Sequence, residues 1–366
     1  MEFTLKDERL EMMKKVLFLE QEELHYALKN QLEHCYDYVY EKEEIGLYAP
    51  GDIPVILLAH LDTVHVSKPT EETLFYDTAK NQMICINNGI GADCRAGVFN
   101  ILELLKKGYR PHVLFSWNEE IGCVGTGFFT EEIQREDATG ILLKEYMSKI
   151  NFAVQFDRRG FNEAVYYSLD NQEFEDYISG FGYHTEWGSF TDIAELCPVT
   201  GFAGVNVSAG YTSEHTRNEI LHVSEMLNTQ MKVENILLDQ MKNPKFFEYK
   251  EYKLKGSSST YDWSDYGYKS LRDDDADAWY DNTTYSKKDS IEVINADSKD
   301  SCYICDMPLV DGSNWEDKKS NIAKIQALTC FDCRDRYYQE EAMLPQWWID
   351  SKIHLGVEVN HKEATY

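Results

Sequence analysis

The sequence predicts an α/β protein with a mixed, mostly parallel central sheet flanked by helices, followed by a small cysteine-rich module. Several apolar runs lack polar alternation, which is typical of strands buried on both faces of a parallel sheet. Segments with helical spacing of apolar residues lie between these runs. Three of the runs end in His, Asp or Glu residues, so we expect polar side chains to gather at one edge of the sheet.

The chain begins with helices that are expected to cover the sheet. Leu10 and Leu17 belong to a set of apolar residues at helical spacing, and Thr4 and Asp7 before them resemble a capping box. The pattern then predicts a second helix over residues 22–35 and a short early strand over residues 36–40.

The first buried strand is predicted over residues 54–59, and His60 and Asp62 follow it on the same side of the chain. An imidazole at His60 can bind a metal ion, and a carboxylate at Asp62 can hold that ring in one tautomer. The alternative for His60 is a hydrogen-bonded histidine of the core.

Asp93 lies in a glycine-rich turn, residues 88–97, just before a helix predicted over residues 98–107. The glycines allow the backbone to bend closely around whatever Asp93 binds, and its two oxygens could bridge two metal ions. Helix N-capping is the alternative role. Cys94 has no second cysteine at a ligand spacing, so we expect it to be structural.

The next buried strand is predicted over residues 112–117, and it leads into Glu119 and Glu120. Adjacent acids at a strand end must diverge. We therefore assign Glu120 to a metal and Glu119 to general-base catalysis, which needs a pKa raised by burial. A solvated pair of charges is the alternative.

A third strand, over residues 152–156, ends at Asp157, which we expect to be a further metal ligand. Because two arginines follow Asp157, a salt-bridged turn is the alternative, and Asp170 and Asp192 are rival ligands. His215 completes the set from a polar loop before a long amphipathic helix over residues 223–241, where an exposed histidine is the alternative.

Four motifs together resemble the co-catalytic zinc exopeptidases, a clan that includes bacterial aminopeptidases, peptidase T, and the glutamate carboxypeptidase and aminoacylase relatives. They are His-Leu-Asp-Thr-Val at 60–64, Gly-Ala-Asp-x-Arg-Ala-Gly at 91–97, Asn-Glu-Glu-Ile-Gly at 118–122 and Glu-His at 214–215. The resemblance covers residues 50 to 225. It implies a three-layer sandwich with two active-site zinc ions, for which cobalt or manganese could substitute.

The resemblance also implies a role for each motif residue. One metal would be bound by His60, Asp93 and Asp157, and the other by Asp93, Glu120 and His215. Glu119 would be the general base, and Asp62 would orient His60. These roles agree with those reached above from the chemistry of the residues.

The chain departs from carboxypeptidase-type relatives, which insert a lid or dimerisation domain before the final histidine. Only 57 residues lie between Asp157 and His215. We expect this segment to continue the main sheet through short strands within residues 161–168, 172–178 and 199–207. We therefore expect the architecture of this chain to be closer to that of the compact aminopeptidases than to that of the carboxypeptidase-type relatives.

The formal charge of -28 disfavours binding of the whole chain to a nucleic-acid backbone. The N-terminal residues show no basic or apolar leader pattern, and no run of 18 apolar residues occurs. We therefore expect a cytoplasmic protein that does not enter a membrane. The sequence also lacks a phosphate-binding glycine loop and a Gly-x-Ser-x-Gly elbow, so nucleotide and serine-hydrolase functions are not indicated.

The composition changes after residue 245. An acidic stretch rich in Ser, Tyr and Asp follows, and its few aliphatic residues predict a flexible linker. Two CxxC pairs then predict a zinc-ribbon-like module with one structural zinc, for which a redox pair is the alternative. The pairs consist of Cys302, Cys305, Cys330 and Cys333. We expect a catalytic domain without a lid insertion at 1–245, a linker at 246–299, the module at 300–340 and a tail at 341–366.

The sequence thus predicts zinc-dependent hydrolysis of peptide bonds by an aminopeptidase or small-peptide exopeptidase. An N-acyl amino acid deacylase or amidase could use the same metal centre, because only the substrate pocket would differ. A non-catalytic adaptor, with a zinc module that binds a protein or nucleic-acid partner, is an alternative from another class. The expected substrate is accordingly a small peptide or an acyl-amino acid.

Overall fold

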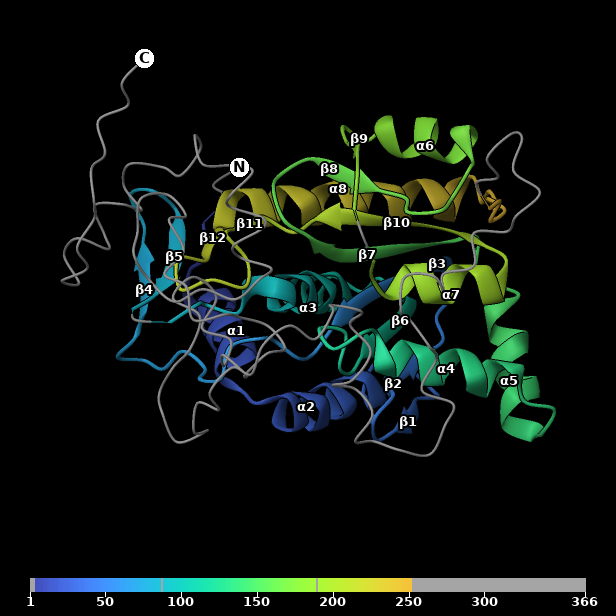
Figure 1. Cartoon of the computed structure of the whole chain (residues 1–366), viewed down its shortest axis with the longest axis horizontal. Coiled ribbons are helices and arrows are strands. Elements are labelled where there is room, and N and C mark those ends of the chain that lie inside the picture. Colours follow the sequence, from blue (N-terminus) through green and yellow to red (C-terminus); the bar gives the residue numbers. More distant parts are fainter. Residues whose placement is uncertain (1–3, 87, 189, 252–366) are drawn as a thin grey trace, which may run out of the picture. The chain divides into compact units, whose positions relative to one another are not determined.

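The structure is a computed structural model that describes residues 4–251, apart from residues 87 and 189. An eight-stranded sheet, in the order β1-β2-β6-β3-β7-β10-β8-β9, forms its centre (Figure 1). The middle strands β6, β3, β7 and β10 run parallel, and β2 and β8 flank them in antiparallel orientation. The strands are β1 (Tyr40–Lys42), β2 (Gly46–Ala49), β3 (Ile53–His60), β6 (Pro111–Ser116), β7 (Phe152–Arg158), β8 (Glu163–Val165), β9 (His184–Glu186) and β10 (Ala203–Ser208).

Helices pack on both faces of this sheet, and each face has its own hydrophobic core. Along β3, Val55 and Leu57 point into one core, whereas Ile56 and Leu58 point into the other, as the alternation of side chains in a strand requires. The first core includes side chains of α1 (Asp7–Phe18), α2 (Gln21–Glu33), α3 (Ala92–Lys106), α6 (Gln172–Ser179) and α8 (Val223–Lys242). The second includes side chains of α4 (Val124–Gln134), α5 (Ala138–Met147) and α7 (Asp192–Thr200). The predicted fold class of this part of the chain is confirmed.

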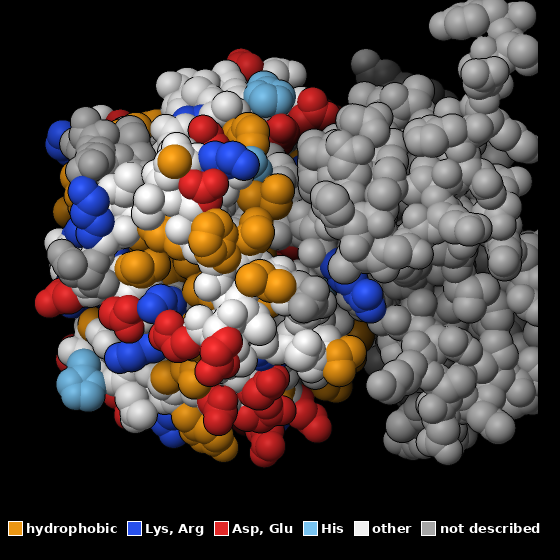
Figure 2. All heavy atoms as spheres, turned by 90° about the vertical axis from the view of Figure 1, so that its left-hand side faces the viewer, with side chains coloured by type: hydrophobic (Ala, Val, Ile, Leu, Met, Phe, Trp, Pro, Cys, Tyr) orange, Lys and Arg blue, Asp and Glu red, His pale blue; other side chains and the backbone are white. Residues whose placement is uncertain are grey.

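A second, four-stranded antiparallel sheet lies beyond the amino-terminal end of α3, at the left of Figure 1. This sheet was not predicted from the sequence. Its strands, in spatial order, are β11 (Tyr211–Thr212), β12 (Ile220–His222), β5 (Gln82–Cys85) and β4 (Leu74–Asp77). Phe75 and Ile84 are paired in register across β4 and β5, and both side chains are exposed. Figure 2 shows hydrophobic side chains gathered on this end of the molecule.

Several local predictions were wrong. Residues 172–178 form helix α6 and not a strand, because Phe174 and Ile178 are four residues apart and both buried, and the Asn171 side chain accepts the Phe174 N–H. The early strand begins only at Tyr40. Helix α1 starts after Lys6, which makes no side-chain cap, so the expected capping box at Thr4 does not form.

Two of the remaining strands are shorter than predicted. Residues 161–168 contribute only the three residues of β8, and residues 199–200 end helix α7 before β10 begins. The strands predicted over 54–59 and 152–156 and the helix predicted over 223–241 are confirmed with changes of one or two residues at their ends. The helix predicted over 98–107 is also present, but it begins six residues earlier, at Ala92.

The described chain continues to Glu251, which pairs with Leu169, and Phe247 is buried in the core. The folded part therefore extends a few residues past the expected boundary at 245. Most of the expected linker, the four-cysteine module and the tail lie outside the described residues, and the structural zinc stays a prediction. Within residues 4–251, no helix is long and apolar enough to cross a membrane.

Candidate metal centre

The ends of β3 and β7 place one group of potential ligands. These strands are parallel neighbours, and His60 and Asp157 lie at their carboxyl ends on the same face of the sheet. The Nε2 atom of His60 is 3.0 Å from Asp157 Oδ1 and 3.2 Å from Asp93 Oδ1. His60 is completely buried, so its imidazole can interact only with groups of this site.

A second group forms around the other oxygen of Asp93. Asp93 Oδ2 is 3.2 Å from the Nε2 atom of His215, and Glu120 Oε2 is 2.9 Å from the same nitrogen. His215 comes from the segment between β11 and β12, and its side chain is 35% exposed. The two carboxylate oxygens of Asp93 therefore face two different histidines, each of which has a further acid beside it.

These separations fit the coordination of zinc. Ligand atoms about 2.0 Å from a tetrahedral ion lie about 3.3 Å from one another, close to the distances in both groups. His60, Asp93 and Glu120 also place ligand atoms within 4.8 Å of one another, as do His60, Cys94 and Asp157. Cys94 is the weaker candidate, because its thiol donates to the Phe156 carbonyl at 2.7 Å and burial raises its pKa well above the ordinary value.

The pKa values of the acids and histidines of this site indicate an environment suited to cations. Burial, reinforced by the charge of Asp93, raises the pKa of Asp157 to about 7. Burial opposes protonation of the histidines, yet the charge of Asp157 raises the pKa of His60 and that of Glu120 raises the pKa of His215, both well above the ordinary value. A cluster in which acids repel one another and histidines attract protons is an environment that binds divalent cations.

The carboxylate of Asp62 interacts with the ring of His60 and with the backbone of Glu119 and Glu120. Its Oδ1 atom is 3.2 Å from His60 Nδ1 and accepts the Glu119 N–H at 3.0 Å, and its Oδ2 atom accepts the Glu120 N–H at 3.0 Å. Burial alone would raise the pKa of Asp62, but these hydrogen bonds outweigh it and lower the pKa. One carboxylate thus orients the ring of His60 and the backbone that carries both glutamates.

Glu119 lies beside both ligand groups without belonging to either. Burial raises its pKa well above the ordinary value, and the negative charge of Asp157 adds to this effect. The thiol of Cys123 lies 3.6 Å from its Oε1 atom. A half-buried carboxylate with a raised pKa, next to but outside the two groups of candidate ligands, is suited to accept and return a proton.

The residues that hold the candidate ligands in place were not predicted from the sequence. Thr191 Oγ1 donates to Asp157 Oδ2 at 2.6 Å, and Gln155 Nε2 donates to the same oxygen at 3.2 Å. The Tyr211 hydroxyl donates to Asp93 Oδ1 at 3.0 Å, and both oxygens of Glu219 accept backbone N–H groups of the Asp93 turn. Of these residues, only Glu219 could have been suspected from the sequence, since it follows His215 by four residues in the same polar loop.

The rival ligands do not join the site. Asp192 is the first residue of α7, is completely buried, and accepts a hydrogen bond from the Ser116 hydroxyl at 2.5 Å. Asp170 has an exposed side chain, and its backbone N–H donates to Lys250. Among the acids that sequence analysis considered for this position, Asp157 is the one beside His60.

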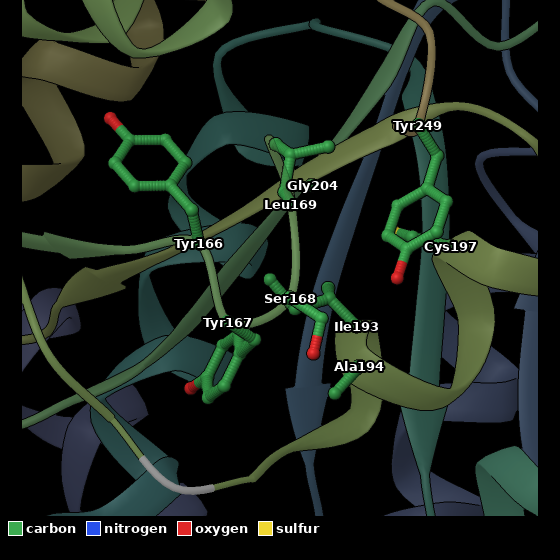
Figure 3. A pocket seen from close by; sticks show the side chains of 9 residues that line it. All are labelled: Tyr166, Tyr167, Ser168, Leu169, Ile193, Ala194, Cys197, Gly204 and Tyr249. Carbon is green, nitrogen blue, oxygen red and sulfur yellow. The ribbon is translucent and has the colours of Figure 1, made fainter. Parts of the chain in front are cut away.

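A small pocket, shown in Figure 3, lies against the start of β10 at Gly204 and against α7 at Cys197. Tyr167 lines it and accepts a hydrogen bond from Asn206 Nδ2 at 2.9 Å, while Asn206 Oδ1 accepts the Asp157 N–H at 2.9 Å. The rings of Tyr166 and Tyr167 point to different sides of the chain. Because Asn206 donates to it, the Tyr167 hydroxyl keeps its own proton for a further acceptor.

No protein-family model matches the chain, and no curated protein sequence matches it. Among solved structures, the chain is similar to a tripeptidase from Staphylococcus aureus, with 11% identity over 63% of this chain and 96% of that chain and a TM-score of 0.47. It is similar to the aminopeptidase PepT from Bacillus cereus, with 12% identity over 64% of this chain and 98% of that chain and a TM-score of 0.46.

A third similar structure is an aminopeptidase from the archaeon Desulfurococcus kamchatkensis, with 12% identity over 63% of this chain and 94% of that chain and a TM-score of 0.46.

Proposed function

We propose that this chain is a two-metal peptidase that removes residues from the end of small peptides, most simply as an aminopeptidase. The observation that carries the proposal is the position of Asp93, whose two oxygens lie 3.2 Å from His60 and 3.2 Å from His215. A single carboxylate between two histidine and acid pairs supports a bridged pair of zinc ions, with cobalt or manganese as substitutes.

Bound metals would supply Lewis acidity toward the scissile carbonyl and an activated water at neutral pH. His60, Asp93 and Asp157 would bind one ion, and Asp93, Glu120 and His215 the other. Thr191 and Gln155 occupy one oxygen of Asp157, so the other oxygen is directed toward His60. We assign to Glu119 the removal of a proton from the attacking water and its delivery to the leaving amine.

The choice of an exopeptidase rests on the motif resemblance at residues 60–64, 91–97 and 118–122. Residues between Asp157 and His215 that the structure describes form β8, α6, β9, α7, β10 and β11. No separate lid domain is present in that described segment, which supports a compact aminopeptidase over a carboxypeptidase-type enzyme. A deacylase would use the same metal centre, so only activity on different substrates can distinguish a deacylase from an aminopeptidase.

The test uses the purified full chain, stripped of metal with a chelator and reloaded with zinc, cobalt or manganese. Aminoacyl nitroanilides, dipeptides, tripeptides and N-acetyl amino acids are offered as substrates. Hydrolysis that needs both metal and a free α-amino group supports the proposal. Activity restricted to N-acyl substrates would identify a deacylase, and a fully metal-loaded chain that cleaves none of these amides would exclude both activities.

Glu119→Gln tests the assignment of the base. We expect it to keep both metals and to lower kcat by about 10²- to 10⁴-fold, because it removes only the positioned proton acceptor. Metal loss in this variant, with retention in Glu120→Gln, would show that the two glutamates have exchanged roles. Normal turnover with normal metal content would refute the base assignment.

A further inference from the structure

Glu219 is a buried carboxylate that connects two loops of the metal centre. Its Oε1 atom accepts the backbone N–H of Asp93 at 3.0 Å, and its Oε2 atom accepts the backbone N–H of Gly91 at 2.8 Å. The Nε2 atom of His65 is 2.8 Å from the same Oε2 atom. Glu219 and His65 are both less than 5% exposed, so these hydrogen bonds have no competition from solvent.

The hydrogen bonds of Glu219 act on the backbone of the residue whose side chain lies between the two histidines. Gly91 has a φ of +68°, a conformation that favours glycine, and it begins the turn that presents Asp93. Carboxylates that accept backbone N–H groups form charge-assisted hydrogen bonds, which are stronger and more directional than neutral ones. Glu219 therefore sets the position from which the Asp93 side chain extends.

Glu219 also belongs to the loop that carries His215. Both residues lie between β11 and β12, separated by three residues. His215 has a φ of +61° and a 35% exposed side chain, whereas His60 is buried at the end of a strand. His215 thus receives less support from regular secondary structure than His60 does, and it depends more on what anchors its loop.

We propose that Glu219 is a positioning residue that joins the His215 loop to the Asp93 turn, and that the metal bound by Asp93, Glu120 and His215 depends on this connection. The inference rests on the two-metal function proposed above. Loss of the Glu219 carboxylate should release that metal first, because one of its ligands is on the freed loop and another is on the freed turn. The metal at His60 and Asp157 keeps two ligands on neighbouring strands.

The test measures metal binding as well as activity in Glu219→Gln and Glu219→Ala. The amide of Gln keeps one acceptor oxygen and the methyl group of Ala keeps none, so we expect metal affinity to fall in the order wild type, Gln, Ala. Chelator competition should show one metal bound at least ten-fold more weakly, within the 10- to 100-fold range typical of residues behind metal ligands. At a free zinc concentration that fills both sites of the wild type but not the weakened site, the zinc-to-protein ratio should fall by one, with kcat affected more than KM.

Glu103→Gln is the matched control, because Glu103 is also a buried glutamate, paired with Arg9 Nε at 2.6 Å, and is not part of the metal centre. It should leave both metal affinities unchanged. Circular dichroism checks that each variant is folded, and the Gln variant provides the test if the Ala variant does not fold. A folded Glu219→Gln that binds both metals with wild-type affinity would overturn the inference. If the wild type binds two metals but cleaves no amide, the proposed function fails, while metal binding still tests Glu219.

Discussion

Asp62→Asn is the most informative single change at this site, because one carboxylate serves three functional groups. Its two oxygens interact with His60 Nδ1 and with the backbone N–H groups of Glu119 and Glu120. Asn has almost the same shape but offers one acceptor oxygen and no charge. Whichever way the new amide turns, its NH₂ group must face at least one N–H that previously had an acceptor.

The size of the effect follows from these contacts. A buried donor left without an acceptor costs about 1–3 kcal/mol of folding stability. Loss of the carboxylate behind a metal-binding histidine weakens metal binding by about 10- to 100-fold. Because the same change loosens the backbone of Glu119, the proposed base, we expect kcat/KM to fall by at least as large a factor as metal affinity.

Three measurements on the full chain check this expectation: chemical denaturation of the metal-free protein, chelator competition for metal, and kcat/KM under saturating metal. Asp77→Asn is a matched control. Asp77 also accepts two backbone N–H groups, from Ala79 and Lys80, but both bind to one oxygen, which Asn retains. An Asp62→Asn variant with wild-type metal affinity and wild-type turnover would refute the reasoning.

Three further predictions concern the metals and the stability of the fold. Asp93→Ala should abolish binding at both active-site positions whereas Asp157→Ala should weaken mainly one, and elemental analysis showing the same single loss in both would exclude a bridging role for Asp93. Burial lowers the pKa of His112 to about 4, so the folded state stays neutral between about pH 6.5 and 4 while the unfolded state takes up a proton, and stability should fall across this interval by about 3 kcal/mol. Denaturation of His112→Gln should lack this part of the pH dependence, and identical pH profiles for the two proteins would contradict the assignment. Cys302→Ser in the full chain should lower total zinc by one per chain with turnover preserved, and unchanged zinc content would argue against a four-cysteine site.

The gathering of the candidate ligands could be predicted because these residues carry local signals. His60 and Asp157 follow apolar runs that are too continuous for a half-exposed strand, and Asp93 lies among glycines before a helix. Parallel strands place their carboxyl ends at one edge, so residues far apart in the chain were expected to meet. The structure places His60, Asp93, Glu120, Asp157 and His215 within hydrogen-bonding distance of one another in two groups.

Prediction from the sequence failed where one short segment carries features of both a strand and a helix. Residues 172–178 contain aromatic and β-branched residues, which favour a strand, but Phe174 and Ile178 recur four residues apart and Asn171 can cap a helix. The four-stranded sheet had no clear signal either, since its strands are only two to four residues long and its central pair, β5 and β12, joins segments that are 140 residues apart in the sequence.

The sequence by itself therefore determined the fold class, the order of the strand-end acids and histidines, and the chemistry that those residues could perform. Only the tertiary structure decided which polar residues support them. Thr191 binds Asp157 from 34 residues away, Tyr211 binds Asp93 from 118, and Glu219 binds the Asp93 backbone from 126. The reason is physical: a buried hydroxyl or carboxylate finds its partner through packing, and the spacing of residues along one segment carries no record of a partner on another.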